Sequence, residues 1–60
     1  MEKRFVGPQE LSQILDLKVD TVYSWAWQRK IPYFKMGRLV KFDLKEIEAW
    51  LKDKRVREIH

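Results

Sequence analysis

The sequence has no cysteine in its sixty residues, so disulfide bonds and thiolate metal sites cannot stabilise its fold. A chain of this length forms one domain at most, and such a domain buries only about 60% of the surface that the unfolded chain exposes. Three Trp, three Phe and two Tyr supply the apolar surface of a small core, and disordered chains lack this aromatic content. We therefore expect one folded domain that depends on its apolar side chains.

The residue content also argues against several functional classes. The longest uninterrupted apolar runs are two or three residues, far below the ~20 that a membrane span needs. The N-terminal residues lack the apolar core of a secretory signal. His60, the only histidine, is the last residue, so a Ser–His pair or a histidine metal site is not expected. We expect a cytoplasmic protein that is not an enzyme and that uses no cofactor and no metal.

The charge balance favours an anionic partner. Thirteen Lys and Arg against nine Asp and Glu give a net charge of +4. Residues 31–60 carry eight basic and five acidic residues, a net of +3, whereas residues 1–30 carry five and four, a net of +1. Small basic domains attract nucleic acid first and membrane surfaces second.

Two short helices joined by a tight turn are expected in the first half of the chain. Pro8 suits the first position of a helix over residues 8–15. Its apolar stripe is formed by Leu11, Ile14 and Leu15. Asp16 tolerates the left-handed conformation, so it can end this helix. A second helix is expected over residues 19–30, ended by Pro32. Its apolar face is formed by Val22, Trp25, Ala26 and the stem of Arg29.

A β-hairpin is expected around Gly37, and its register depends on the loop length. A two-residue loop would pair Phe34 with Lys41, which mixes apolar and charged side chains on one face. A three-residue loop would pair Phe34 with Phe42 and Lys35 with Lys41, which leaves one face apolar. We favour the three-residue loop.

The last helix has the clearest start signal. Asp43 and Glu46 have the spacing of a capping box, which begins a helix. The buried stripe of this helix is expected to be Leu44, Ile47, Trp50 and Leu51. With the hairpin over residues 33–42, these elements predict an α+β, mostly helical fold of three helices plus a two-stranded hairpin. We expect the domain to cover residues 1–51 and a basic extension to cover 52–60.

Two helices joined by a tight turn can form a helix-turn-helix, whose second helix enters the major groove of DNA. The candidate contacts on this helix are Val19, Asp20, Thr21, Tyr23, Ser24 and Gln28. Asp20 argues against DNA, because phosphates repel a carboxylate unless it accepts from a cytosine amine or pairs with a lysine. Most helical hairpins with polar outer faces never bind DNA, so the pattern alone leaves both interpretations open.

The hairpin adds the cations Lys35, Arg38 and Lys41, with no acid before Asp43. A Lys35–Lys41 pair would destabilise the sheet unless an external anion lay against it. Solvated lysines also protect exposed sheet edges, so charge alone favours neither interpretation.

Trp27 is unusual because it lies on the polar side of the second helix. We expect it to pack on the hairpin through Tyr33 or Phe34. The alternative is an exposed anchor for a partner protein.

The sequence resembles the excisionase family over about residues 5–51. The most specific elements are Thr21-Val22-Tyr23 ahead of Trp25, the hairpin motif Pro32-x-x-Lys35-x-Gly37-Arg38, and the closing Ala49-Trp50-Leu51. Excisionases are small winged helix-turn-helix domains related to the head of MerR-type regulators. This chain departs from the family pattern at Asp16 (usually Gly), Lys18 (usually a Ser or Thr cap), Ser24 (often basic) and Arg29-Lys30 (usually small residues).

The resemblance implies a reading helix in the major groove and a hairpin wing on phosphates or in the adjacent minor groove. The six candidates of the second helix and the three hairpin cations would then be DNA contacts. The implied function is sequence-specific binding of double-stranded DNA, as an accessory factor in the recombination of a mobile element or as a small transcription regulator. An integrase or further copies of the chain would be partners, and the protein would be associated with the nucleoid. MerR-type regulators continue into a coiled coil and an effector pocket, and the nine residues after Leu51 hold neither, so no small-molecule effector is expected.

A protein-interaction module is the main alternative, in which the basic face, Trp27 and the last helix bind an acidic protein. A membrane-surface role for residues 44–59 is less favoured, because the apolar residues of this segment are expected in the core. We therefore expect no membrane partner.

Overall fold

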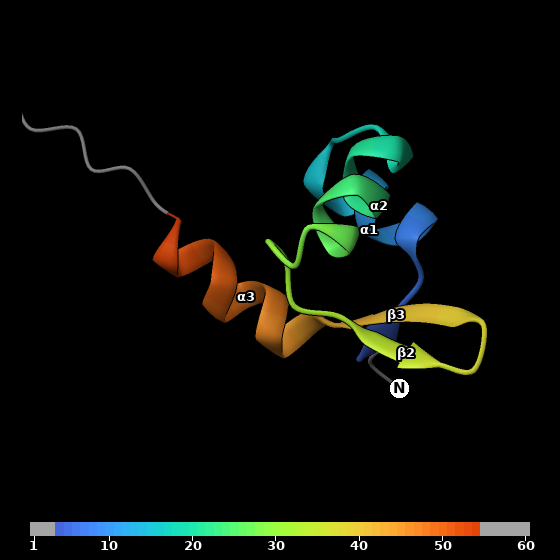
Figure 1. The fold of residues 1–60 in the computed structure, drawn as a ribbon. Helices are drawn as coiled ribbons and strands as arrows, with labels where there is room; N and C mark the ends of the chain where they lie inside the picture. The colour runs from blue at the N-terminus through green and yellow to red at the C-terminus, as the bar shows by residue number, and fades with distance from the viewer. Residues whose placement is uncertain (1–3, 55–60) are drawn as a thin grey trace, which may run out of the picture.

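The structure is a computed structural model and describes residues 4–54. Its elements are β1 (Phe5–Val6), α1 (Pro8–Leu15), α2 (Val19–Trp27), β2 (Phe34–Met36), β3 (Leu39–Asp43) and α3 (Leu44–Asp53). Helices α1 and α2 pack together on one side of a small sheet, and α3 extends from the end of β3, away from the hairpin turn (Figure 1). This α+β, mostly helical architecture is the expected one. Most of the proposed 52–60 extension lies outside the described residues.

The sheet has three antiparallel strands in the order β1-β3-β2, rather than two. Phe5 pairs with Asp43 and Val6 pairs with Phe42, so the short β1 covers the second edge of β3. As a result β3 is the central strand and ties the hairpin to the N-terminal segment.

The hairpin register differs from the expected one. Phe34 pairs with Lys41 and Lys35 pairs with Val40, so the loop has two residues and the three-residue prediction is wrong. The reason is that β2 contributes no buried residue: all three of its side chains are exposed, so no apolar face had to be completed there. Gly37, at φ 62°, supplies the positive φ that the first position of a two-residue loop requires.

Helix α1 has the predicted bounds, and its end is closed by two backbone hydrogen bonds. Asp16 adopts the predicted left-handed conformation at φ 54°. The Asp16 N–H donates to the Gln13 carbonyl at 3.3 Å, and the Leu17 N–H donates to the Ser12 carbonyl at 2.9 Å, which together form a Schellman motif. Ile14, expected in the apolar stripe, is 57% exposed instead, and the side of α1 that faces the core carries Ser12.

Helix α2 ends earlier than the predicted residue 30. Its last residue is Trp27, and Arg29 adopts the left-handed conformation at φ 58°. The Arg29 N–H donates to the Ala26 carbonyl at 3.0 Å and the Lys30 N–H to the Trp25 carbonyl at 2.8 Å, a second Schellman motif. The left-handed conformation of Arg29 therefore ends the helix before Pro32, the residue that was expected to end it.

The core lies between the two N-terminal helices, β3 and the first turns of α3. Its buried apolar residues are Val6, Leu11, Val22, Ala26, Ile31, Val40, Phe42 and Ile47. Trp25 and Trp50 pack against it while staying partly exposed. Leu51, expected in the buried stripe of α3, is 42% exposed, because α3 leaves the sheet before this position is covered.

Candidate nucleic-acid interface

One exposed strip runs along α2. It consists of Asp20, Tyr23, Ser24 and Trp27, which have the spacing i, i+3, i+4, i+7 and so lie on one side of the helix. The opposite side carries Val22 and Ala26, which are fully buried. The same helix therefore packs against the core with one side and presents an exposed surface with the other.

Aromatic contacts join this strip to the hairpin. The Tyr23 and Trp27 rings stack with centroids 6.4 Å apart. The Trp27 ring in turn meets the edge of Tyr33 at 6.5 Å, one residue before β2 begins. The predicted packing of Trp27 on Tyr33 is confirmed, but Trp27 remains 59% exposed. The aromatic row thus forms a continuous surface from the middle of α2 to the start of the hairpin.

The remaining candidates of α2 lie at its ends. The Gln28 Nε2 donates to the Ser24 Oγ at 2.8 Å, and both side chains are exposed. This bond leaves Gln28 one N–H and its carbonyl oxygen for another partner. Val19 and Thr21, in the first turn, are half-buried. Trp27 was not among the candidate DNA contacts, although its spacing of four from Tyr23 was a signal that it shares the exposed strip.

The structure does not place the three hairpin cations on one face. Lys35 pairs with Val40, which is buried against the helices, so Lys35 lies on the helix-facing side of the sheet. Lys41 is one residue further along β3 and lies on the outer side. Arg38 is exposed in the loop. The expected like-charge pair of Lys35 with Lys41 is therefore wrong.

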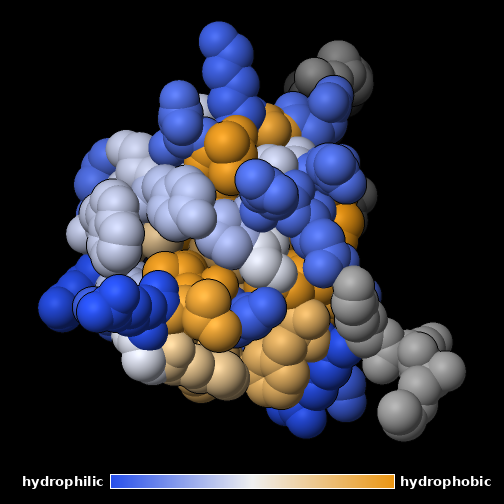
Figure 2. Space-filling view, turned by 90° about the vertical axis from the view of Figure 1, so that its right-hand side faces the viewer, coloured by the Kyte–Doolittle hydropathy of each residue, from blue (hydrophilic) through white to orange (hydrophobic). Residues whose placement is uncertain are grey.

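The outer side of the sheet is apolar. Phe5 and Phe34 meet edge to face at 5.8 Å, and Met36 and Leu39 are 48% and 60% exposed near the turn. Figure 2, which views the molecule from the side of the hairpin turn, shows apolar surface bordered by hydrophilic side chains. Lys41, half-buried, shares this side with the four apolar residues.

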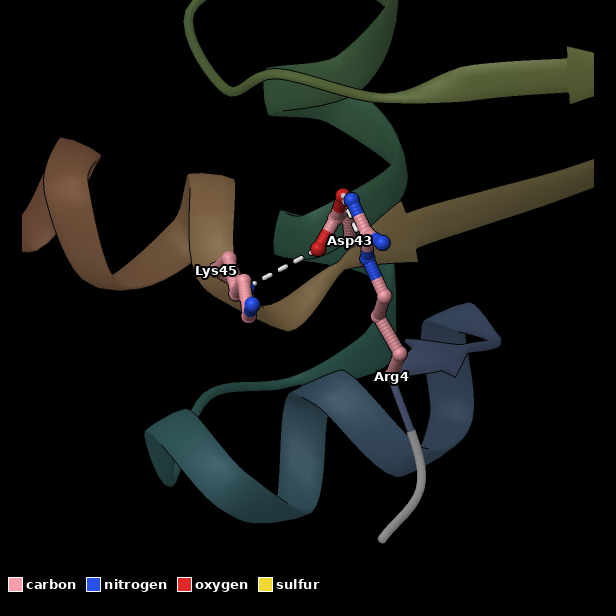
Figure 3. Close-up of polar contacts among 3 residues, drawn as sticks. All are labelled: Arg4, Asp43 and Lys45. Atoms are coloured by element: carbon pink, nitrogen blue, oxygen red, sulfur yellow. Dashed lines mark hydrogen bonds and ion pairs between the residues drawn. The ribbon is translucent and has the colours of Figure 1, made fainter.

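An ion pair fixes the start of α3 and so orients the sheet (Figure 3). The Arg4 guanidinium donates to the Asp43 Oδ2 from Nη2 at 3.0 Å and from Nε at 3.2 Å. The other oxygen of Asp43 accepts from the Lys45 N–H at 2.9 Å, which confirms the predicted N-cap. The hydrogen bond from Arg4 is the main cause that lowers the pKa of Asp43, and the same bond raises the pKa of Arg4. These residues position the sheet and are not part of the α2 strip.

The arrangement of α1, the tight turn and α2 is that of a helix-turn-helix, and residues 5–55 match the helix-turn-helix domain family. The chain belongs to this family. Membership supports DNA as the partner of this helix-turn-helix domain, and domains of this kind are generally not enzymes. No curated protein and no solved structure gives a significant match. Among the described helices of the domain, none has the length and apolar content to cross a membrane.

Proposed function

We propose that this helix-turn-helix domain binds double-stranded DNA in a sequence-specific manner, with α2 in the major groove and the hairpin as a wing on the adjacent backbone. The observation that carries the proposal is the continuity of the α2 strip with the hairpin through the Trp27–Tyr33 contact. A recognition surface needs exposed side chains on one side of the second helix, and α2 presents them at helical spacing.

The side chains on this surface suit different parts of a duplex. Tyr23 and Ser24 carry hydroxyls that bind phosphate oxygens or base edges. Gln28 keeps an N–H and a carbonyl oxygen, the pair of groups that recognises adenine. Asp20 would accept from a cytosine amine. Val19 and Thr21, at the N-terminal end of α2, would approach the groove wall.

The wing contacts are unequal in this proposal. Lys35 lies on the helix-facing side of the sheet, and Arg38 lies at the turn. Both therefore reach the DNA backbone beside the groove that α2 occupies. Lys41 lies on the outer side of the sheet. Its positive charge attracts DNA at long range but makes no direct phosphate contact. The cations that matter most in this proposal are thus Lys35, on the helix-facing side, and Arg38, at the turn.

We further propose an excisionase-like role in recombination, with a small transcription regulator as the alternative; the motifs of residues 5–51 support both. One small module buries about 600–1,000 Å² on DNA. Tight binding would then require several copies on repeated sites, or a recruited integrase. A protein-interaction module without DNA binding is the competing function, and it predicts no affinity for any duplex.

Selection from random duplexes followed by a salt titration tests the proposal. The selection should return a defined sequence, and repeats in it would give the spacing of copies. We expect about 3–5 neutralised phosphates, which gives a slope of log affinity against log salt of roughly −3 to −5. Fluorescence anisotropy with the selected duplex measures this slope. Absence of duplex binding at low salt would reject DNA binding, and equal binding to all sequences would reject specificity.

A further inference from the structure

A groove lies on a part of the molecule that the DNA surface does not use. It has a volume of about 730 Å³ and runs between the C-terminal part of α2 and α3. Its lining is apolar at the base and basic at the rim, and consists of Leu15, Leu17, Trp25, Trp50, Leu51, Arg29, Lys30 and Lys54. None of these is a residue of the α2 strip. A ligand in the groove would therefore leave that strip free.

The base of the groove is held in place by contacts within the domain. The Trp25 and Trp50 rings lie 6.0 Å apart between centroids at an angle of 60°. The Trp50 Nε1 donates to the Lys30 carbonyl at 2.7 Å, which fixes α3 against the end of α2. With its one polar ring atom satisfied, Trp50 presents an apolar face to the groove. The groove is thus formed before any ligand arrives.

The rim carries cations only. Arg29, Lys30 and Lys54 are all exposed, and among the described residues that line the groove there is no acid to neutralise them. Arg29 also holds a left-handed backbone conformation, φ 58°, that glycine adopts more easily. Non-glycine residues in this conformation occur at functional sites more often than elsewhere. An arginine here places a cation at the rim despite the backbone cost.

We propose that this groove binds an acidic amphipathic segment of a partner protein. A large apolar side chain of the segment packs against Trp25 and Trp50, and flanking carboxylates pair with Arg29 and Lys30. Charge complementarity selects this occupant, because an apolar base alone would accept any hydrophobic segment, whereas a rim of three cations rejects basic ones. Residues 55–60 of the chain, with two Arg against one Glu, lack the complementary charge.

The inference can be tested without DNA, so it stands or falls separately from the proposed function. The probe is a synthetic amphipathic peptide of Leu, Phe and Glu, added to the ¹⁵N-labelled full chain. The three tryptophans give three indole N–H signals, assigned with single Trp→Phe variants. We expect the peptide to move the signals of Trp25 and Trp50 and to leave that of Trp27 in place. A peptide with Lys in place of Glu should move none of them.

Matched charge reversals locate the contact. Arg29→Glu with Lys30→Glu should weaken peptide binding about tenfold, since the double change removes two ion pairs with the peptide carboxylates. Lys35→Glu with Arg38→Glu makes the same change of charge on the hairpin and should leave the peptide affinity unchanged. Arg29→Gly removes the side chain while its backbone favours the native left-handed conformation. This variant should bind the peptide more weakly while the domain stays folded.

Several results would overturn the proposal. These are an absence of shifts at Trp25 and Trp50, equal shifts at Trp27, or equal weakening by the two charge reversals. Shifts of the same two signals on simple dilution of the chain would show that a second copy occupies the groove. Shifts on deletion of residues 55–60 would show that the end of the chain does.

Discussion

The two sides of α2 have opposite relations to the rest of the molecule. Val22 and Ala26 are completely buried and hold the helix against the core. Tyr23 and Trp27, each one residue further along, are 39% and 59% exposed. A stacked pair at i,i+4 that stays largely in water adds only about 0.2–0.5 kcal/mol to stability, whereas the same exposed rings can add affinity for a ligand that covers them. The comparison separates residues that hold the fold from exposed residues that the proposed function assigns to DNA recognition.

The largest expected effect is on the buried side. Phe42 is fully buried at the centre of the core, and truncation of such an aromatic side chain costs about 3–5 kcal/mol. A core of this size supplies no more than about 3–5 kcal/mol. Phe42→Ala should therefore unfold the domain, as seen in the loss of the cooperative thermal transition by circular dichroism. A variant that melts cooperatively near the wild-type temperature would contradict the assigned core.

On the exposed side, Tyr23→Ala should reduce DNA binding and leave the fold intact. We expect a loss of about 1–3 kcal/mol in affinity for the selected duplex, and a change within about 0.5 kcal/mol in unfolding free energy. Anisotropy and urea denaturation measure the two quantities. Leu51→Ala, which truncates another exposed apolar side chain away from the strip, should change neither the affinity nor the site preference. A large loss of stability in Tyr23→Ala would place Tyr23 in the core.

The hairpin cations allow a comparison between the turn, which carries Arg38, and the outer side of the sheet, which carries Lys41. Arg38→Ala should weaken binding to all duplexes alike. It should also flatten the slope of log affinity against log salt by about one unit, because one phosphate contact is lost. Lys41→Ala removes the same charge from the outer side and should flatten the slope by less. Equal changes in the two variants would mean that the position of the cation on the hairpin does not matter. No change in Arg38→Ala would remove the wing from DNA binding.

The two helix ends offer a smaller test. Asp16 and Arg29 occupy equivalent left-handed positions, where a non-glycine residue costs about 1–2 kcal/mol. Glycine relieves this cost but adds backbone entropy to the unfolded chain, about 0.5–1 kcal/mol. Arg29→Gly should therefore raise the free energy of unfolding by about 0.5–1 kcal/mol, measured in urea. A loss of stability would show that the Arg29 side chain itself supports the fold.

The last prediction concerns pH, and its effect is confined to acid. The Arg4 hydrogen bond lowers the pKa of Asp43, so the folded state favours the ionised carboxylate. The resulting stability is present above the unfolded value of about 3.9 and is lost as the pH falls through the lowered folded value. Arg4→Gln should reduce the loss of stability at acid pH, and Asp43→Asn should abolish it. Thermal unfolding recorded from neutral to acid pH measures both. An unchanged acid profile in Asp43→Asn would contradict the role of this pair.

Local signals in the sequence were sufficient where a residue acts within its own segment. Pro8 and Asp16 fixed both ends of α1, because one supplies a helical φ and the other tolerates a left-handed one. Asp43 marked the N-cap of α3 in the same way. The motifs of the helix-turn-helix were readable for the same reason, and the family match agrees with them.

Features that depend on tertiary burial were not readable from the pattern. The hairpin register was predicted by assuming that Phe34 needs a buried face, yet of the two hairpin strands only β3 contributes buried residues, and Phe34 is exposed. Ile14 was placed in the core by its spacing, although within residues 4–54 no element covers that side of α1. Arg29 ends α2 in a left-handed conformation that arginine does not favour, so the sequence did not predict the end of the helix at this position. The site candidates stay a prediction, and the hairpin register decides on which side of the sheet Lys35 and Lys41 lie.

The most direct measurement is a titration of the ¹⁵N-labelled chain with the selected duplex, followed through the three tryptophan indole signals. The central claim is that the exposed side of α2 and the hairpin form one DNA surface. It predicts that the Trp27 signal moves together with the backbone signals of Ser24 and Arg38, while Trp25 and Trp50 stay in place. Movement of Trp25 and Trp50 with Trp27 unchanged would place the DNA on the opposite part of the molecule and contradict the claim.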